Sequence, residues 1–379
     1  MTIVDYELFE VTPRFQYLRL ETDDGSVGWG EPVIEGRAKT VRTAVEELLE
    51  GYLLGEDPTR IEDHWQRMYR GGFYRGGPIL MSAIAGIDQA LWDLKGKEFG
   101  APVYELLGGK ARDRLRLYAH VPAREDSPEA YGEGAASRVE EGFTCLKTSI
   151  AFPIRRVDRP GVIEQERERI AAIREAIGPD VDLGIDFHGR VTKPMAKRLV
   201  VAFEEFDPMF YEEPVLPEHN DALSAIAGLT SIPIATGERM FSRWDVKEVF
   251  ESQAIDVVQP DLSHAGGITE VKKIAAMAEA YDVALAPHCP LGPVALSACV
   301  QVDACSPNAL VQEQIVRQAD HPYVENIDVL QIDDEGYIDL PNRPGLGLEI
   351  DADALRDHAG TYEWAVPETR HDDGGLAEW

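Results

Sequence analysis

Three acidic residues recur along this chain at an even spacing, each near the end of an apolar run. Asp186, Glu212 and Glu238 are separated by 26 residues in both intervals. That interval is about the length of one strand, one helix and their loops in a barrel of alternating strands and helices. Carboxylates without a cysteine partner favour a hard cation, Mg²⁺ ahead of Mn²⁺, over zinc. The sequence therefore predicts a metal-dependent enzyme.

Two histidines stand close to such carboxylates. His188 is two residues after Asp186, and the alternation of side chains along a strand would place both on one face. His288 ends another apolar run, and Asp261 follows the run before it. That carboxylate could hydrogen-bond one ring nitrogen and leave the other as a base. The alternatives are a histidine that satisfies a backbone group and, for Glu212, plain surface charge.

The elements that would position these residues alternate between short apolar runs and helices. Eight runs rich in β-branched or aromatic residues are separated mostly by segments with helical spacing. They are Leu115–Ala119, Thr144–Ser149, Asp182–Phe187, Met209–Glu212, Pro233–Thr236, Asp256–Gln259, Val283–Pro287 and Leu310–Glu313. Eight such units predict an α/β fold, a (β/α) barrel of the modified TIM type, with its site at the carboxyl ends of the strands. An open doubly wound sheet is disfavoured, because no glycine-rich phosphate motif follows the first run.

The beginning of the chain has a different pattern. The runs Tyr17–Thr22 and Val27–Glu31, split by the turn Asp23–Ser26, indicate a β-hairpin. Helical spacing follows over residues 38–53, 58–70 and 79–99. An antiparallel sheet followed by helices predicts an α+β domain.

We therefore expect three parts. Residues 1–112 form an α+β capping domain, residues 113–340 form the barrel, and residues 341–379 form a tail that ends on Trp379 and packs back on the capping domain. Residues 151–162 are expected to be an irregular loop that overhangs the active site of the barrel.

The composition indicates a folded but strongly acidic chain. Its 379 residues include 68 acidic and 37 basic residues, for a net charge of −31, and 44% are hydrophobic. Only ten of the basic residues are lysines, a bias that resembles proteins of salt-loving organisms, with an ordinary acidic enzyme as the alternative. The charge disfavours nucleic acid and anionic membranes as partners. Without a signal peptide or an apolar run of about 18 residues, a cytoplasmic location is expected.

Longer motifs around these residues match a known family. They are Gly28–Arg37, Gly71–Pro78, Asp186–Val191, Gly237–Arg243, Gln259–Ile268 and Pro287–Pro293. Over nearly its whole length the chain resembles the mandelate racemase subgroup of the enolase superfamily. The resemblance implies that Asp186, Glu212 and Glu238 bind one Mg²⁺, which chelates the carboxylate of a small sugar-acid substrate. It also implies a homo-oligomer, often an octamer.

The resemblance implies a role for the remaining residues too. His288, oriented by Asp261, would take the C2 proton, and His188 would protonate the departing C3 hydroxyl. Glu313 would hydrogen-bond the carboxylate as it becomes an enediolate. Such chemistry needs a cation, a base and an acid, because the proton is weakly acidic and hydroxide leaves poorly. The product would be a 2-keto-3-deoxy acid.

One departure from the family bears on the reaction. Many racemases of the superfamily carry Lys-x-Lys on the second barrel strand, whereas this chain has Lys147 and then Ser149. Ser149 cannot be the second base, so racemisation is disfavoured and Lys147 is a candidate substrate or electrostatic contact. The resemblance favours dehydration of D-galactonate, with D-gluconate or D-xylonate as alternatives, and an epimerase or a non-catalytic homologue as rivals.

Admitting an anionic substrate to an acidic protein requires local positive charge. Besides the metal, Arg14, Arg190 and Arg239 are candidates for it. The predicted substrate-binding set is Arg14, Lys147, His188, Arg239, His288 and Glu313.

Overall fold

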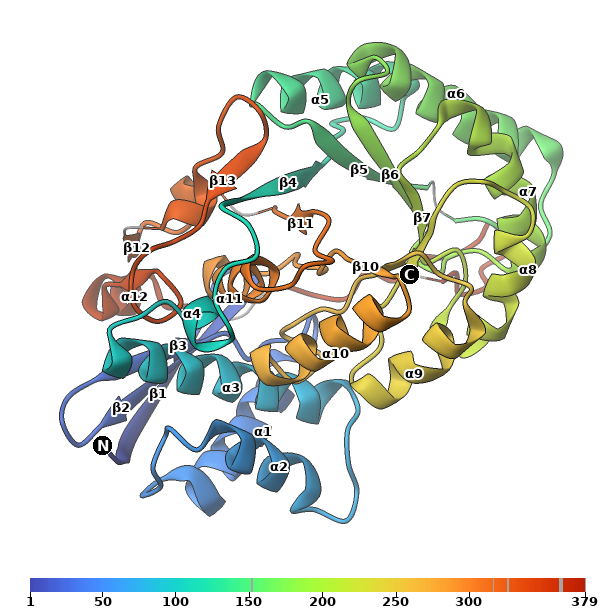
Figure 1. The fold of residues 1–379 in the computed structure, drawn as a ribbon. Coiled ribbons are helices and arrows are strands. Elements are labelled where there is room, and N and C mark those ends of the chain that lie inside the picture. The colour runs from blue at the N-terminus through green and yellow to red at the C-terminus, as the bar shows by residue number, and fades with distance from the viewer. Residues whose placement is uncertain (151–152, 316, 326, 361–363, 379) are drawn as a thin grey trace.

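Eight parallel strands form the centre of the computed structural model (Figure 1). The structure describes residues 1–150, 153–315, 317–325, 327–360 and 364–378. The strands are β4 (Arg114–His120), β5 (Cys145–Ser149), β6 (Asp182–Asp186), β7 (Phe210–Glu212), β8 (Ile234–Thr236), β9 (Val257–Val258), β10 (Ala284–Leu285) and β11 (Gln312–Glu313). The order of pairing is β10-β9-β8-β7-β6-β5-β4-β11. A parallel bridge between Leu285 and Ala309 links β10 to the segment before β11, so the pairing runs round a ring. The predicted barrel is confirmed.

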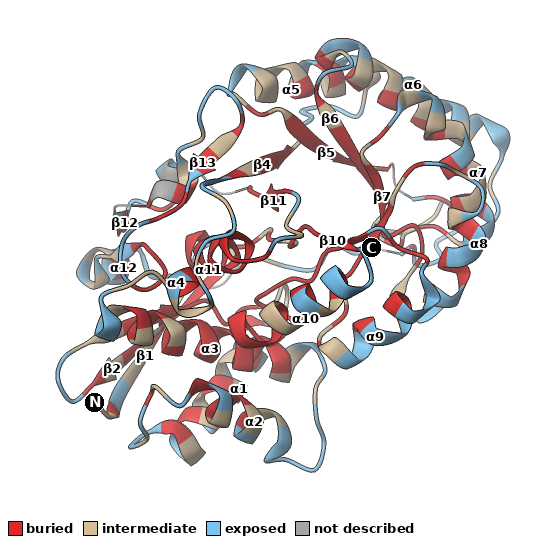
Figure 2. Ribbon diagram, in the orientation of Figure 1, coloured by how far each residue is buried: buried red, intermediate tan, exposed pale blue. Residues whose placement is uncertain are grey.

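Seven helices follow the strands β4 to β10 in turn. They are α5 (Pro128–Glu140), α6 (Pro160–Ile177), α7 (Lys193–Phe203), α8 (Leu223–Ala227), α9 (Arg243–Ser252), α10 (Ile268–Ala280) and α11 (Pro293–Ala304). Figure 2 shows helices such as α6 and α9 exposed on their outer side, whereas every residue of α11 is buried. A helix apolar all round must be covered on all sides. The N-terminal part of the chain covers the outer side of α11, through α4 and β3.

The N-terminal part is a three-stranded antiparallel sheet packed against helices. Its elements are β1 (Ile3–Val11), β2 (Phe15–Thr22), β3 (Val27–Gly30), α1 (Ala38–Leu48), α2 (Ile61–Arg70), α3 (Pro78–Phe99) and α4 (Val103–Leu106), with a π-helical turn at Leu49–Leu53. The structure contains the predicted hairpin, with Glu21 opposite Val27. Strand β3 lies very close to α3, because a Cβ on Gly30 would meet the carbonyl oxygen of Gly86 at 1.9 Å.

The segment that follows the barrel returns to the N-terminal part. It contains β12 (Val324–Glu325), β13 (Tyr337–Asp339), β14 (Glu349–Ile350) and α12 (Ala352–His358), and β13 pairs antiparallel with β4. The N–H of Val103 donates to the carbonyl of Gly345 at 3.0 Å, and Arg356 pairs with Glu7 at 2.6 Å. The division of the chain at residues 112 and 340 stays a prediction.

The last described residues differ from the expected packing. Asp372 pairs with Arg155 at 3.3 Å, in the loop after β5, so the end of the tail reaches the barrel rather than only the capping domain. That loop is also shorter than expected, since α6 begins at Pro160, a residue suited to the first helical position. Residues 151–152 and Trp379 lie outside the described residues. None of the described helices is long and apolar enough to cross a bilayer.

We expect the protein to be more stable in molar KCl than at low ionic strength. Its net charge of −31 produces self-repulsion, and the screening length falls from about 10 Å at 0.1 M salt to about 3 Å at 1 M. Thermal unfolding followed across a KCl series should show a rising Tm. A Tm that is equal at low and molar salt would contradict the salt-adapted interpretation of the composition.

Candidate active site

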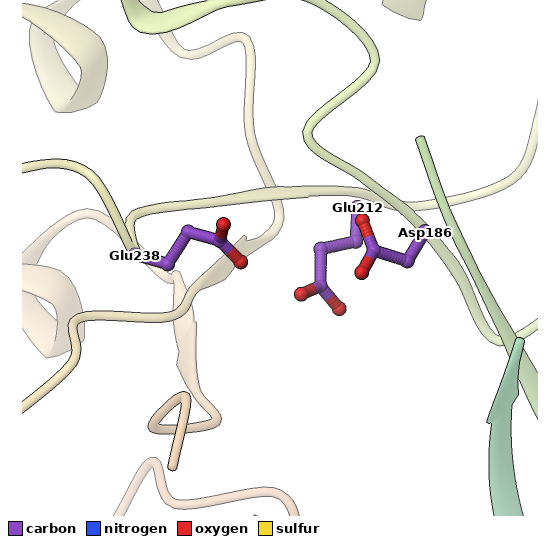
Figure 3. Close-up of side chains that lie close together, drawn as sticks. All are labelled: Asp186, Glu212 and Glu238. Atoms are coloured by element: carbon purple, nitrogen blue, oxygen red, sulfur yellow. The ribbon is translucent and has the colours of Figure 1, made fainter. Parts of the chain in front are cut away.

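Three carboxylates meet at the carboxyl ends of three neighbouring strands. Asp186 ends β6, Glu212 ends β7, and Glu238 lies two residues after β8. The register places Asp186 beside Glu212. One ligand oxygen of each residue lies within 4.8 Å of the others, and Figure 3 shows the three side chains entering one space. The even spacing in the sequence thus corresponds to one βα unit per ligand.

The donor set fits a divalent cation. Asp186 Oδ2 and Glu238 Oε2 are buried, and their nearest cationic or titratable neighbours are imidazoles, His188 Nδ1 at 2.8 Å and His288 Nε2 at 3.5 Å. Burial raises the pKa of the Glu212 carboxyl well above its usual value, and the neighbouring charge of Asp186 adds to the effect. Buried, mutually repelling carboxylates are costly unless a positive charge compensates them. Oxygen donors of this kind suit a hard cation.

Lys147 supplies one positive charge to this cluster from β5. Its Nζ lies 2.7 Å from Glu212 Oε1, 3.0 Å from Glu313 Oε1 and 3.6 Å from Asp186 Oδ2, and its side chain is 1% exposed. Burial alone would lower the pKa of Lys147, but Glu212 and Glu313 raise it well above its ordinary value. The residue is therefore a fixed cation, which favours the electrostatic role over that of a base.

His288 and Asp261 lie side by side at the ends of neighbouring strands. His288 Nδ1 is 2.9 Å from Asp261 Oδ2, and the N–H of Ser263 holds the other oxygen of Asp261 at 2.8 Å. The opposite ring nitrogen, Nε2, faces Glu238 at 3.5 Å and Glu313 at 3.9 Å. Burial would lower the pKa of His288, yet these carboxylates and Asp261 raise it well above its usual value. The predicted pair is thus brought together, with Nε2 turned toward the acidic cluster.

His188 lies beside Asp186, but not for the predicted reason. Strand β6 ends at Asp186, and His188 has φ of 51°, in the left-handed region. This turn, rather than alternation along a strand, brings His188 Nδ1 to 2.8 Å from Asp186 Oδ2. His188 follows β6 and His288 follows β10, four positions apart in a ring of eight strands. The two imidazoles therefore stand on opposite sides of the barrel mouth.

Besides Lys147, two further groups hold Glu313, and the sequence interpretation missed the side chain of His120. His120 Nε2 lies 2.5 Å from Glu313 Oε1, and the N–H of Cys289 donates to Oε2 at 2.6 Å. His120 ends β4, so the signal that indicated Asp186, a polar residue closing an apolar strand, could have found it. Gln259 was missed in the same way, although its amide donates to Glu212 Oε2 at 2.8 Å.

The arginines predicted to contact substrate make hydrogen bonds within the protein. Arg239 binds the buried Glu213 and donates to the carbonyl of His188 at 2.8 Å, which supports the turn that carries this histidine. Arg14 donates to the carbonyl of Pro290 at 2.7 Å. Their contact with substrate stays a prediction.

A cavity of about 340 Å³ opens beside Lys147 at the ends of β4 and β5. Its lining includes the basic side chains of His120, Lys147, Arg169 and Arg190, together with one carboxylate, Asp126. The size suits a small molecule, and the charge suits an anionic or hydroxylated one.

Comparison with known proteins matches two family models to this chain. The family described as "Mandelate racemase / muconate lactonizing enzyme, N-terminal domain" matches residues 11–108, and "Enolase C-terminal domain-like" matches residues 130–354. The D-galactonate dehydratases of Ralstonia pickettii and Xanthomonas oryzae pv. oryzae are 51% and 52% identical to this chain. Each match covers the full length of both proteins compared. The solved mandelate racemase/muconate lactonizing enzyme of Jannaschia sp. CCS1 is 33% identical, with a TM-score of 0.89 over 95% of this chain and 98% of its own. An enolase superfamily member of Salmonella Typhimurium is 29% identical, with a TM-score of 0.87 over 94% and 97%.

Proposed function

The chain belongs to the mandelate racemase and muconate lactonizing enzyme family of the enolase superfamily, and from this premise we propose that it dehydrates a sugar acid, D-galactonate. The observation that carries the proposal is the pair of histidines on opposite sides of the acidic cluster. One can serve as a base and the other as an acid, which is what elimination of water next to a carboxylate requires. The identity of 51–52% to D-galactonate dehydratases, over the full length of both chains, supports the choice of substrate.

Asp186, Glu212 and Glu238 would hold one Mg²⁺, the hard cation that suits three carboxylate oxygens. When bound, the ion supplies positive charge that opposes the negative charge developing on the substrate carboxylate. Lys147 adds a fixed charge from within the protein, next to Glu212 and Glu313. In this proposal Glu313 hydrogen-bonds the substrate carboxylate as that carboxylate becomes an enediolate.

His288 takes the C2 proton at Nε2, while Asp261 holds Nδ1 and stabilises the imidazolium that results. The electron pair of the broken C–H bond first enters the carboxylate, which becomes an enediolate, and it then forms the C2–C3 double bond as the C3–O bond breaks. His188 gives a proton to the C3 hydroxyl, which leaves as water. The enol then takes up a proton at C3 and loses the proton of its C2 hydroxyl, which gives the 2-keto-3-deoxy acid. Because the histidines flank the substrate, proton and hydroxyl leave toward different sides of it.

The proposal is tested with Mg²⁺ and a panel of aldonic acids. D-galactonate should give a 2-keto-3-deoxy product faster than D-gluconate or D-xylonate. An epimerase would instead carry solvent deuterium into recovered substrate at C2 without losing water. If the protein turned over no acid of the panel, the dehydratase proposal would be contradicted. The interpretation as a non-catalytic homologue would then be favoured.

We expect His188→Asn to separate the two halves of the reaction. Loss of the acid should lower dehydration by about 100- to 10,000-fold, while exchange of the C2 proton with deuterium, which needs His288, persists. Mass spectrometry of recovered substrate measures the exchange. His358→Asn, in the exposed α12, is the matched control and should change neither rate. If His188→Asn lost C2 exchange as well as dehydration, His188 could not be acting only as the acid.

A homo-oligomer also stays a proposal. Its support is an aromatic pair in the loop between α2 and α3, where Phe73 and Tyr74 are 92% and 88% exposed. Large aromatic side chains at such exposure are typical of surfaces that another protein covers.

A further inference from the structure

Two side chains of the N-terminal part hold the loop that carries His288. Arg14 Nη2 donates to the carbonyl of Pro290 at 2.7 Å. Glu31 accepts from the N–H of Gly292 at 2.7 Å through Oε1 and from the N–H of Ala295 at 3.0 Å through Oε2. Both oxygens of this fully buried carboxylate are therefore committed to the beginning of α11.

The local packing leaves Glu31 little freedom to move. It directly follows β3, and its own N–H donates to the side chain of Gln89 on α3 at 2.8 Å. On the other side, a Cβ on Gly292 would lie 2.5 Å from Glu31 Oε1 and 2.8 Å from the hydroxyl of Tyr17. The start of α11 thus sits directly on the carboxylate, and only glycine leaves enough room.

The contacts of Glu31 begin four residues after His288. Between them, the N–H of Cys289 donates to Glu313 Oε2 at 2.6 Å. A displacement of this short loop would move the imidazole of His288 and a donor to Glu313 together. We propose that Glu31 is a positioning residue for the dehydration, which fixes the loop of His288 from outside the barrel; this rests on the proposed function. Misplacement of a reacting group by about 1 Å costs on the order of 100-fold in rate.

A simple stabilising role makes a different prediction. A carboxylate at a helix N-terminus also stabilises the helix, through its hydrogen bonds and the helix dipole. Asp88 offers a matched case: it is a fully buried carboxylate of α3, and it accepts from the N–H of Thr269 at 3.0 Å at the start of α10. Burial raises the pKa of both Glu31 and Asp88 to about 7, so the two should be compared at pH 8, where both are mostly ionised.

The experiment compares Glu31→Gln with Asp88→Asn in the full chain. We expect both to lower Tm, but only Glu31→Gln to lower kcat, by about 10- to 100-fold, with KM within about 2-fold of the wild type. If Glu31→Gln does not fold, Gly292→Ala takes its place. Its added methyl group would crowd the Glu31 carboxylate from the side of α11, and the variant should show the same loss of kcat. An unchanged kcat in Glu31→Gln, or an equal loss in Asp88→Asn, would overturn the proposal.

A second measurement needs no substrate. The imidazole N–H of His288 that faces Asp261 should give a downfield proton resonance, assigned by its absence in His288→Asn. We expect it to shift or broaden in Glu31→Gln and to stay in place in Asp88→Asn. If the wild type dehydrates no aldonate, the proposed function fails, and this comparison still decides whether Glu31 positions His288. The same resonance in wild type and Glu31→Gln would rule that out.

Discussion

Replacing His288 with asparagine should lower kcat for dehydration by about 1,000-fold, within the range that general-base catalysis contributes. Asparagine keeps a polar group of similar size beside Asp261 but has no basic nitrogen facing Glu238 and Glu313. Exchange of the C2 proton should be lost to the same degree, because it needs the same base. This loss of exchange distinguishes the variant from His188→Asn.

Two controls accompany this measurement. The Tm and the affinity for Mg²⁺ of His288→Asn should stay near those of the wild type, since the residue is not one of the three proposed ligands. His358→Asn again serves as the neutral substitution. Retention of more than about a tenth of the activity would be too small a loss for a general base and would contradict the role.

Glu238→Gln should weaken the binding of Mg²⁺ by more than about 100-fold, since substitutions of outer partners of metal ligands alone cost about 10- to 100-fold. The amide removes one of three carboxylate charges and leaves a poorer oxygen donor. Titration calorimetry with MgCl₂ on protein stripped with EDTA measures the affinity, and dehydration should fall in parallel. The stripped wild type should itself be inactive until Mg²⁺ is restored.

Glu213→Gln is the matched control for this substitution. Glu213 is a buried carboxylate next to Glu212 in the chain, but it binds Arg239 and is not part of the acidic cluster. Its variant should keep the affinity for Mg²⁺ within a few-fold, even if it loses stability. Equal affinity in the Glu238→Gln and Glu213→Gln variants would remove the three-carboxylate site.

Barrel strands were predictable because parallel strands are buried on both faces and read as short apolar runs. Residues at equivalent places in successive strand–helix repeats lie at the same end of the barrel. The even spacing of Asp186, Glu212 and Glu238 therefore predicted that they meet there. Strand β1 was missed, since only some of its residues are buried and its polar residues blur the alternation.

Other features of the site depend on information that a local pattern does not carry. The position of His188 follows from a left-handed backbone at a residue other than glycine, which no residue type specifies. The pairing of Asp372 with Arg155 joins segments 217 residues apart, and the contacts of Glu31 with α11 span more than 260 residues. Such contacts become visible only when the chain is folded.

The complete burial of α11 has a consequence for how the molecule must be made. One side of this helix packs against the barrel strands β4 and β11, and the other contacts α4 and β3 of the N-terminal part. Removal of either part would expose buried apolar surface of the other part to water. The two parts should therefore melt in a single cooperative transition. During synthesis α4 and β3 are made before α11, whereas the turn Asp328–Leu330, which also contacts it, follows later.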